Sequence, residues 1–266
     1  MKINWDSEVL SSVSKAVDQL EYLSINKDSI ESVADWLAYE EFPIPNSAAV
    51  RDDADDFIRA TMFMNTLNFA FTDFDKSIKY EINKDGKILS DSEAMYFQVN
   101  NAISSGIKLI EGNVMASITL KQLETIFVGN IEMPMLKERV EILNEVGQKL
   151  VDSYEGDWIN FINNGPKKLY SDGGGLIERL IEEFPRFDDS SQFKESKVKL
   201  YKLAQLAFWV IHAELSESHY FKIDDMNSMT AFADYIIPVA LSLKKITTYS
   251  PQLDLSLIHI SEPTRL

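Results

Sequence analysis

Cysteine is absent from this 266-residue chain, and its absence excludes disulfides, thiolate nucleophiles and zinc held by cysteine. Histidine is scarce, and His212, His219 and His259 do not show the i, i+4 spacing of two metal ligands on one helix. We therefore expect no bound metal. Long apolar runs are also missing. A run such as Leu206–Ile211 is far shorter than the roughly 20 residues that cross a bilayer, so no membrane span is expected.

Positive charge is in deficit. The chain has 26 lysines and arginines against 42 aspartates and glutamates, which gives a formal net charge of −16. Binding to a nucleic-acid polymer depends on cations that neutralise phosphates, so we expect no direct nucleic-acid partner. A small anionic ligand is still compatible, because two or three well-placed cations suffice. The N-terminal sequence MKINWD has no apolar signal region, and a cytoplasmic location is expected.

Glycine is sparse, with 10 residues, and the run Gly173–Gly175 lacks the features of a phosphate-binding loop. No predicted strand precedes it, and no Gly-Lys-Ser/Thr follows it. We interpret the run as a turn before a helix, and we expect no cofactor.

The sequence contains ordinary globular composition, 45% hydrophobic and 26% charged. Apolar residues recur at three- and four-residue spacing, which is typical of amphipathic helices. We predict helices at about 7–23, 29–39, 53–66, 92–105, 119–127, 176–184, 199–215 and 229–244, and a long one that starts at Pro134. A kink is expected at Pro238. The alternation Ile78, Tyr80, Ile82 before an Asp-Gly turn predicts one β-hairpin. The predicted fold is therefore mainly α, a single helical domain with a small β-hairpin.

The last residues, Leu255–Arg265 (LSLIHISEPTR), resemble the in-frame translation of a transposase sequencing adapter. Foreign segments of this kind do not belong to the fold. We expect a helical domain over residues 1–254, truncated at its C-terminus, and an adapter-derived tail over residues 255–266. The alternative is a natural irregular tail.

Two charged residues interrupt apolar surroundings. Lys202 lies one turn into the most apolar predicted helix, and Asp234 lies within Phe232–Pro238 (FADYIIP). A buried unpaired charge is costly, so each residue should have a partner or a task. The pattern leaves three readings open: a structural ion pair, two side chains that reach solvent, or a functional pair.

Several segments, in this order along the chain, resemble the queuosine salvage protein family. They are Leu67–Phe71 (LNFAF), Pro134–Gly147 (PMLKERVEILNEVG), Glu183–Phe187 (EFPRF), Tyr201–Gln205 (YKLAQ) with Phe232–Tyr235 (FADY), and Tyr249–Pro251 (YSP). The resemblance extends from about residue 7 to residue 254. It implies an enzyme that hydrolyses the N-glycosidic bond of queuosine 5′-monophosphate and releases queuine for tRNA queuosine salvage. It also implies a helical core similar to that of helix-hairpin-helix DNA glycosylases.

The resemblance assigns catalysis to Asp234 and Lys202. A carboxylate at Asp234 can stabilise the positive charge that develops on the sugar and can help to activate water. Lys202 would orient the ribose or the 5′-phosphate, or assist departure of the base.

The resemblance also suggests residues that hold the substrate. Phe69, Phe71 and Tyr235 are candidates to stack on the base, although packing in the core explains them equally well. Asn68 is a candidate to bind a base edge, or else a cap or turn residue. Asp73 and Asp75 are candidates for the cationic amine of the queuine side chain.

The chain departs from the family at three positions. Members usually carry arginine where this chain has Leu203 and Ile236, and often tryptophan where it has Thr72. Substrate choice would change if those arginines contact the phosphate. One alternative is therefore a glycosidase for another nucleotide or nucleoside. Another is a non-catalytic helical module that binds queuine or a nucleotide. A glycosylase that acts on nucleic acid is disfavoured by the net charge. Nothing in the sequence indicates whether the protein is a monomer or an oligomer.

Overall fold

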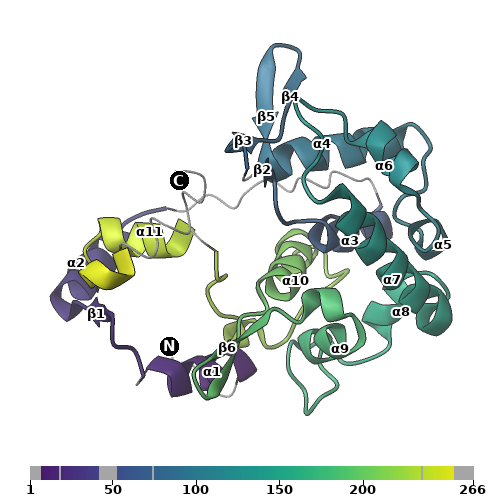
Figure 1. Cartoon of the computed structure of the whole chain (residues 1–266). Helices are drawn as coiled ribbons and strands as arrows, with labels where there is room; N and C mark the ends of the chain where they lie inside the picture. The colour runs from purple at the N-terminus through teal and green to yellow at the C-terminus, as the bar shows by residue number, and fades with distance from the viewer. Residues whose placement is uncertain (1–6, 18, 42–52, 74, 235, 255–266) are drawn as a thin grey trace.

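The computed structural model describes residues 7–17, 19–41, 53–73, 75–234 and 236–254. The chain is mainly helical, as predicted (Figure 1). Its helices are α1 (Glu8–Val17), α2 (Lys27–Leu37), α3 (Ala54–Thr66), α4 (Asp91–Ser104), α5 (Gly112–Met115), α6 (Leu120–Ile126), α7 (Leu136–Tyr154), α8 (Trp158–Asn163), α9 (Leu176–Glu183), α10 (Lys202–Leu215) and α11 (Ile236–Leu243), with 3₁₀ turns η1 (Pro185–Phe187) and η2 (Met226–Ser228).

The described strands form two-stranded antiparallel sheets. They are β1 (Leu23–Ile25) with β8 (Thr247–Tyr249), β2 (Thr72–Asp73) with β3 (Ile78–Lys79), β4 (Glu81–Lys84) with β5 (Lys87–Ser90), and β6 (Ser190–Phe193) with β7 (Ser196–Lys199). The predicted hairpin is confirmed as β4–β5, whose turn residues Asp85 and Gly86 both have positive φ. The other pairs were not predicted. β2 and β3 have two residues each, β1 and β8 come from distant parts of the chain, and β6 (SSQF) and β7 (SKVK) lack a clear alternation of apolar and polar residues.

Two predicted helices are shorter at their N-terminal ends than the periodicity indicated. α10 begins at Lys202, so the prediction that Lys202 lies one turn inside the helix is wrong. Residues 196–199 pair in β7 instead, and Tyr201 has a left-handed backbone with φ 51°. α7 begins at Leu136 because Met135 is left-handed, with φ 55°. Pro134 is therefore not its first helical residue.

The first and last predicted helices also need correction. α1 ends at Val17, and the residues near Leu23 form β1 against β8 from the far end of the chain. α11 begins at Ile236 rather than near residue 229. Pro238 is thus the third residue of the helix. The N–H groups in the first turn of a helix have no intrahelical partner. A proline at this position therefore breaks no hydrogen bond, and no kink is expected.

The core lies between α3, α10 and the helices around α7. α10 packs against α3 and α9, and α7 packs against α5, α6 and α8. α10 is central and mostly buried, as its all-round apolar character predicted. Gly147 allows the close contact of α7 with α5, because a Cβ there would lie 2.2 Å from the backbone nitrogen of Ala116.

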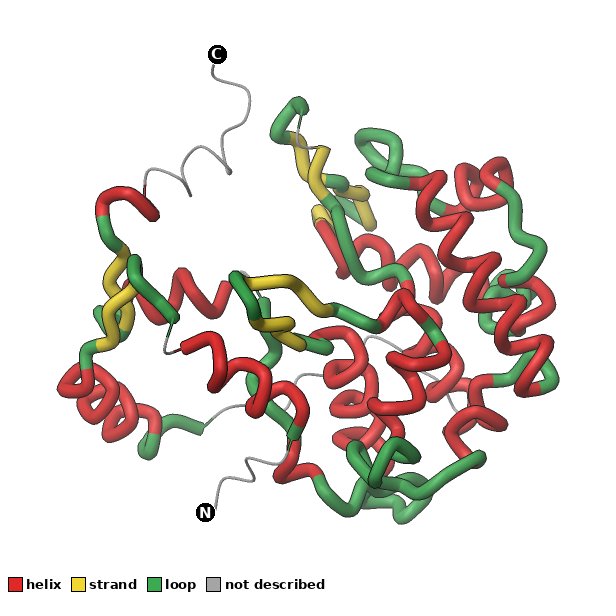
Figure 2. The backbone as a smooth tube through the Cα atoms, turned by 60° about the horizontal axis from the view of Figure 1, so that its bottom comes forward, coloured by secondary structure: helices red, strands yellow, loops and turns green. Residues whose placement is uncertain are grey.

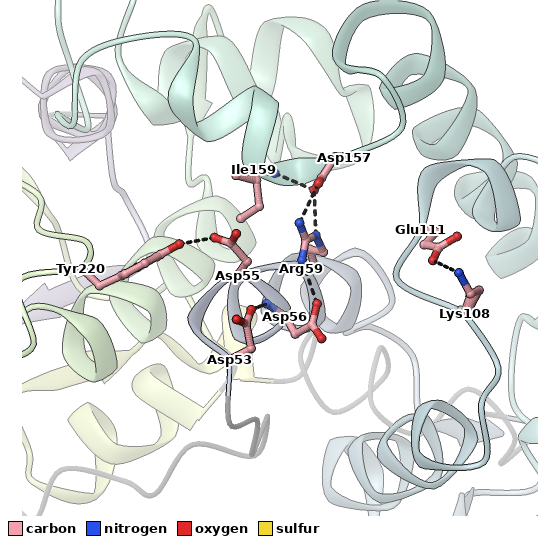
Figure 3. Close-up of polar contacts among 9 residues, drawn as sticks. All are labelled: Asp53, Asp55, Asp56, Arg59, Lys108, Glu111, Asp157, Ile159 and Tyr220. Atoms are coloured by element: carbon pink, nitrogen blue, oxygen red, sulfur yellow. Dashed lines mark hydrogen bonds and ion pairs between the residues drawn. The ribbon is translucent and has the colours of Figure 1, made fainter.

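An arginine fixes α3 against α8 at the edge of this core (Figure 3). Arg59 binds Asp157 through two hydrogen bonds of 2.9 and 2.7 Å and also binds Asp56 at 2.8 Å. Asp53 caps α3 by accepting the Asp56 N–H at 3.0 Å. The acidic start of α3 therefore serves helix capping and packing.

β1, α2, α11 and β8 form a terminal unit at one side of the molecule (Figures 1 and 2). β1 and β8 pair, and α11 packs against β8. Neither α2 nor α11 contains a buried residue. Large apolar side chains are instead exposed on both helices, among them Ile30, Trp36, Leu37, Ile236, Ile237, Val239 and Leu243. The terminal unit therefore contributes little to the main core. Within the part of the chain that the structure describes, every helix is too short or too polar to cross a membrane.

Candidate functional site

After α10 the chain turns back and runs antiparallel to this helix. His212 Nδ1 accepts the Ile223 N–H at 3.0 Å. Further along, Gln205 Oε1 accepts the Thr230 N–H at 2.8 Å. The return segment, residues 223–234, therefore moves toward the N-terminal end of α10 as its residue numbers rise.

The return segment brings Asp234 to Lys202. Lys202 Nζ donates to Asp234 Oδ2 at 2.5 Å, and the Ile236 N–H donates to Asp234 Oδ1 at 3.0 Å. The side chains of Lys202 and Asp234 are each 25% exposed. The sequence left open an ion pair, exposure to solvent or a functional pair. The first two are both observed, because the two side chains form an ion pair and are also partly exposed.

The environment of Asp234 keeps its carboxyl ionised. Partial burial opposes ionisation, but the hydrogen bonds from Lys202 and from the Ile236 N–H, with the charge of Lys202, outweigh it. The pKa of Asp234 therefore lies below its usual 3.8. Since a carboxylate accepts about four hydrogen bonds, lone pairs remain for a water molecule or a substrate hydroxyl.

The segment before Lys202 is held by α1. The Lys199 N–H donates to Ser12 Oγ at 2.9 Å, and the Tyr201 hydroxyl donates to Glu8 Oε2 at 3.3 Å. Tyr201 is 2% exposed and takes the left-handed conformation, which is unfavourable for a bulky residue. These contacts set the point at which α10 begins.

A second cluster surrounds the loop that follows α3. Asn68 Nδ2 donates to the Tyr96 hydroxyl at 3.1 Å. Phe69 lies under two guanidinium groups, with 4.3 Å from its ring centroid to Arg139 Cζ and 4.6 Å to Arg186 Cζ. Both distances are typical of cation–π contacts. Its ring thus already has two partners.

The two arginines hold the backbone of this loop. Arg139, which is fully buried, donates to the carbonyl oxygens of Leu67, Phe69, Ala70 and Pro134. Arg186 Nε donates to the Thr66 carbonyl at 2.7 Å. Together they satisfy carbonyl groups at and beyond the C-terminal end of α3, where helices leave acceptors unpaired.

Burial lowers the pKa of both guanidinium groups to about 10. Arg186 contributes to the lowering at Arg139, because the two positive charges repel one another. Both groups still carry their charge at neutral pH. Arg139 and Arg186 were missed by the sequence analysis, although each lies inside a segment that carries the family resemblance.

The other predicted site residues have mixed placements. Phe71 is half-buried against the core, and Arg139 lies 5.2 Å from its ring centroid. Asp73 pairs with the exposed Lys76 at 2.8 Å, and this contact keeps the pKa of Asp73 below its usual value. Tyr235 and the predicted tail over residues 255–266 lie outside the described residues.

The two clusters are linked through secondary structure. α10, which begins at Lys202, packs against both α3 and η1, and η1 contains Arg186. Among the described residues, the side chains of Asn68 and Asp73 bond to Tyr96 and Lys76 and not to the Lys202–Asp234 pair. Nor does any group of three or more His, Asp or Glu side chains there have the arrangement of a metal site.

The chain is similar in sequence to a known protein family. A family model described as "Queuosine salvage protein" matches residues 48–262. A queuosine 5′-phosphate N-glycosylase/hydrolase of Sphaerobacter thermophilus is 25% identical over 248 residues, which are 92% of this chain and 75% of that protein. A protein of the same name from Bos taurus is 29% identical over 191 residues, 71% of this chain and 55% of the relative. One from Schizosaccharomyces pombe is 26% identical over 242 residues, 84% of this chain and 66% of the relative.

The chain therefore spans between 55% and 75% of the length of these three relatives. The family match extends over most of the chain and includes both the Arg139–Arg186 cluster and the Lys202–Asp234 pair. This chain belongs to the queuosine salvage protein family.

Proposed function

We propose that this chain hydrolyses the N-glycosidic bond of queuosine 5′-monophosphate and releases queuine, with Lys202 and Asp234 as its catalytic pair. The observation that carries the proposal is the 2.5 Å contact between two side chains that are each 25% exposed. An ionised carboxylate is thereby held in place and is still open to a ligand. The names of the relatives support the choice of substrate.

The reaction fits the chemistry of Asp234. When the C1′–N bond breaks, its electron pair leaves with the base and positive charge develops on the ribose. The carboxylate of Asp234 stabilises that charge and accepts a proton from the water whose oxygen bonds to C1′. The departing base takes up one proton from solvent and Asp234 releases the proton that it accepted, so one water molecule is consumed and the products are queuine and ribose 5-phosphate.

Lys202 acts next to the carboxylate. Its ammonium keeps Asp234 ionised and fixes one carboxylate oxygen, while the Ile236 N–H fixes the other. The ammonium retains further donors for a ribose hydroxyl or a phosphate oxygen. A preorganised charge of this kind lowers the barrier without rearrangement during the reaction.

The substrate-binding residues form part of the same proposal. Phe69, Phe71 and Tyr235 are proposed to stack on the base, and the ring of Phe69 also contacts Arg139 and Arg186. Asn68 is proposed to bind a base edge, and Asp73 the amine of the queuine side chain. For Asn68 and Asp73, the ligand would have to displace or share Tyr96 and Lys76.

We assign the activity to the domain of residues 1–254 and propose a cytoplasmic location and a small nucleotide substrate rather than a nucleic acid. The test is incubation of the protein with queuosine 5′-monophosphate and quantification of both products. We expect free queuine and ribose 5-phosphate in equal amounts. Binding without product would instead identify a module that holds the nucleotide, and faster release from tRNA would identify a nucleic-acid glycosylase.

A second candidate is a glycosidase for another nucleotide or for the nucleoside. The observation that favours it is the apolar character of the positions next to the pair, since Leu203 is 7% exposed and Ile236 is 58% exposed. Neither residue supplies a cation for a 5′-phosphate. Parallel assays with queuosine, queuosine 5′-monophosphate and guanosine 5′-monophosphate decide between the candidates by their kcat/KM.

A further inference from the structure

Gln205 makes three hydrogen bonds from a fully buried position. Its side-chain Nε2 donates to the Leu200 carbonyl at 3.0 Å, and its Oε1 accepts from the Thr230 N–H at 2.8 Å and from Thr230 Oγ1 at 3.0 Å. The residue is 0% exposed. The nitrogen and the oxygen of its side-chain amide therefore both have partners inside the protein.

The partners of Gln205 lie in the two segments that carry the ion pair. Leu200 is two residues before Lys202, and Thr230 is four residues before Asp234. Gln205 itself is on α10, three residues beyond Lys202. One side chain thus joins the beginning of α10 to the return segment close to the point where Asp234 meets Lys202.

The Thr230 end of this bridge lies outside regular secondary structure. Thr230 follows η2, and residues 229–234 are neither helix nor strand. Their backbone groups are therefore not placed by a regular ladder. Trp209 on α10 also contacts Phe232 edge to face, with ring centroids 6.0 Å apart. This apolar contact does not by itself fix the position of the return segment along α10.

A buried amide is an unusual choice for packing alone. Its burial is costly unless every polar atom is bonded, and an apolar side chain of the same length would fill the space without that cost. Satisfied buried amides instead specify one arrangement of the segments they join. The contacts of Gln205 specify where the return segment lies along α10.

We propose that Gln205 is a positioning residue that fixes the return segment against the start of α10 so that the Asp234 carboxylate meets the Lys202 ammonium. The inference rests on the proposed function for its catalytic consequence. The positioning of Asp234 against Lys202 by Gln205 is independent of the proposed function and can be tested by the titration of Asp234.

The first test is Gln205→Met, which keeps the length of the side chain and removes all three hydrogen bonds. Displacement of a reacting group by about 1 Å costs up to roughly 100-fold in rate. We expect kcat to fall about 10- to 100-fold while KM changes less than about 3-fold, the pattern of an interaction needed in the transition state.

A matched control separates positioning from stability. Asn144 on α7 also uses a side-chain amide to hold two backbone carbonyls, those of Met115 and Ile118, at 2.9 and 3.1 Å. Asn144→Leu should lower the midpoint of urea unfolding as Gln205→Met does and leave kcat unchanged. Equal loss of kcat in both variants at matched stability would overturn the positioning role.

A conservative variant provides rescue. In Gln205→Glu the carboxylate can accept from Thr230, but it can donate to Leu200 only when it is protonated. Burial favours the protonated form. We therefore expect the rate of Gln205→Glu, relative to the original chain at each pH, to rise as the pH falls. If the rate of Gln205→Glu relative to the original chain does not change with pH and equals that of Gln205→Met, the hydrogen bonds of Gln205 do not position the pair.

A readout without turnover keeps the inference apart from the proposed function. The carboxyl ¹³C shift of Asp234, followed by NMR against pH, reports its pKa directly. Loss of the bridge weakens the contact with Lys202, so the Asp234 pKa should rise toward its usual 3.8 in Gln205→Met and stay unchanged in Asn144→Leu. An unchanged pKa in Gln205→Met would overturn the inference.

Thr230→Val supplies a variant that should fold even if Gln205→Met does not. It removes the hydroxyl contacts with Gln205 Oε1 at 3.0 Å and with the Ala231 carbonyl at 3.4 Å and keeps the N–H bond to Gln205. A smaller change of kcat and of the Asp234 pKa in the same directions is therefore expected. If the unchanged protein releases no queuine, the proposed function fails, and the Asp234 titration still decides the role of Gln205.

Discussion

Single residues organise the loop that precedes the β2–β3 sheet, and Arg139 contributes most. It is 0% exposed, and its guanidinium donates four hydrogen bonds to neutral carbonyl oxygens rather than to a carboxylate. Planar guanidinium geometry allows one side chain to hold several acceptors at fixed angles. Arg139 therefore determines the course of the chain through Asn68 and Phe69.

Replacement of Arg139 by lysine should reveal this role. A lysine keeps the charge, but its compact ammonium cannot reach all four carbonyls, and each buried acceptor left unpaired costs roughly 1–3 kcal/mol. We expect Arg139→Lys to lower the free energy of unfolding by at least about 2 kcal/mol, measured by urea denaturation.

Lys137→Met on the exposed side of α7 is the control, and it should change the free energy of unfolding by less than about 0.5 kcal/mol. If Arg139→Lys is as mild as this control, Arg139 does not hold the loop.

The sequence contained a signal for Arg139. The residue falls on the same face of the helix as Leu136, Leu143 and Val146, all of which are buried. A charged residue on an apolar stripe should have a buried partner, as we argued for Lys202 and Asp234. Its partners could not be predicted, because backbone carbonyls of an irregular loop leave no pattern in the sequence.

At the scale of elements, α10 and the return segment show what periodicity can and cannot predict. The apolar residues of α10 predicted a central helix, and the structure confirms it. The return segment was predicted as part of a helix from residue 229, and that prediction is wrong. Two of its N–H groups, those of Ile223 and Thr230, bind the side chains of His212 and Gln205 on α10. Such contacts between distant residues leave no periodic pattern in the sequence.

His212 makes the stability of this arrangement sensitive to pH. Its Nδ1 accepts the Ile223 N–H and must be unprotonated to do so. Burial, with the charge of Lys222, lowers the pKa of His212 below its usual 6.5. The unfolded chain therefore binds a proton more readily than the folded chain does, and the stability present above the unfolded pKa is lost as the pH falls through the folded value.

Replacement of His212 by asparagine should remove this dependence, because the asparagine oxygen can accept the same N–H without titrating. Between about pH 7.5 and pH 5.5, the free energy of unfolding should fall less in His212→Asn than in the original chain. His219→Asn, at an exposed position, should behave like the original chain. The same pH slope in all three proteins would contradict the role of His212.

At the scale of the whole molecule, the chain divides into a well-buried body and the terminal unit. The body was predicted in outline, since its helices follow apolar periodicity. The β1–β8 pair was not, because Leu23 and Tyr249 come from opposite ends of the described chain and strands of three residues carry little pattern. The helical core similar to that of DNA glycosylases stays a prediction.

The difference in burial predicts a difference in local stability. α2 and α11 have no buried residue, whereas most residues of α3 and many of α7 are buried. Segments with few buried contacts open with lower free energies. In hydrogen exchange followed by mass spectrometry, we expect amides of α2 and α11 to exchange at least about 10-fold faster than those of α3 and α7.

Equal protection in all four helices would show that the terminal unit is part of the same cooperative core. The result also bears on the site, because Asp234 is two residues before Ile236, the first residue of α11, and receives a hydrogen bond from its N–H. Opening of α11 would release that bond.

If the Lys202–Asp234 pair cleaves the N-glycosidic bond, the single-turnover rate of queuine release must depend on the Asp234 carboxylate, and Asp234→Asn tests this. Asparagine keeps the shape and removes the negative charge, so the rate should fall by at least about 100-fold. Binding of queuosine 5′-monophosphate, measured in the same protein, should weaken much less. Asp152→Asn, an exposed carboxylate on α7, should retain the full rate. Release of queuine by Asp234→Asn at the rate of the unchanged chain would contradict the catalytic role of Asp234.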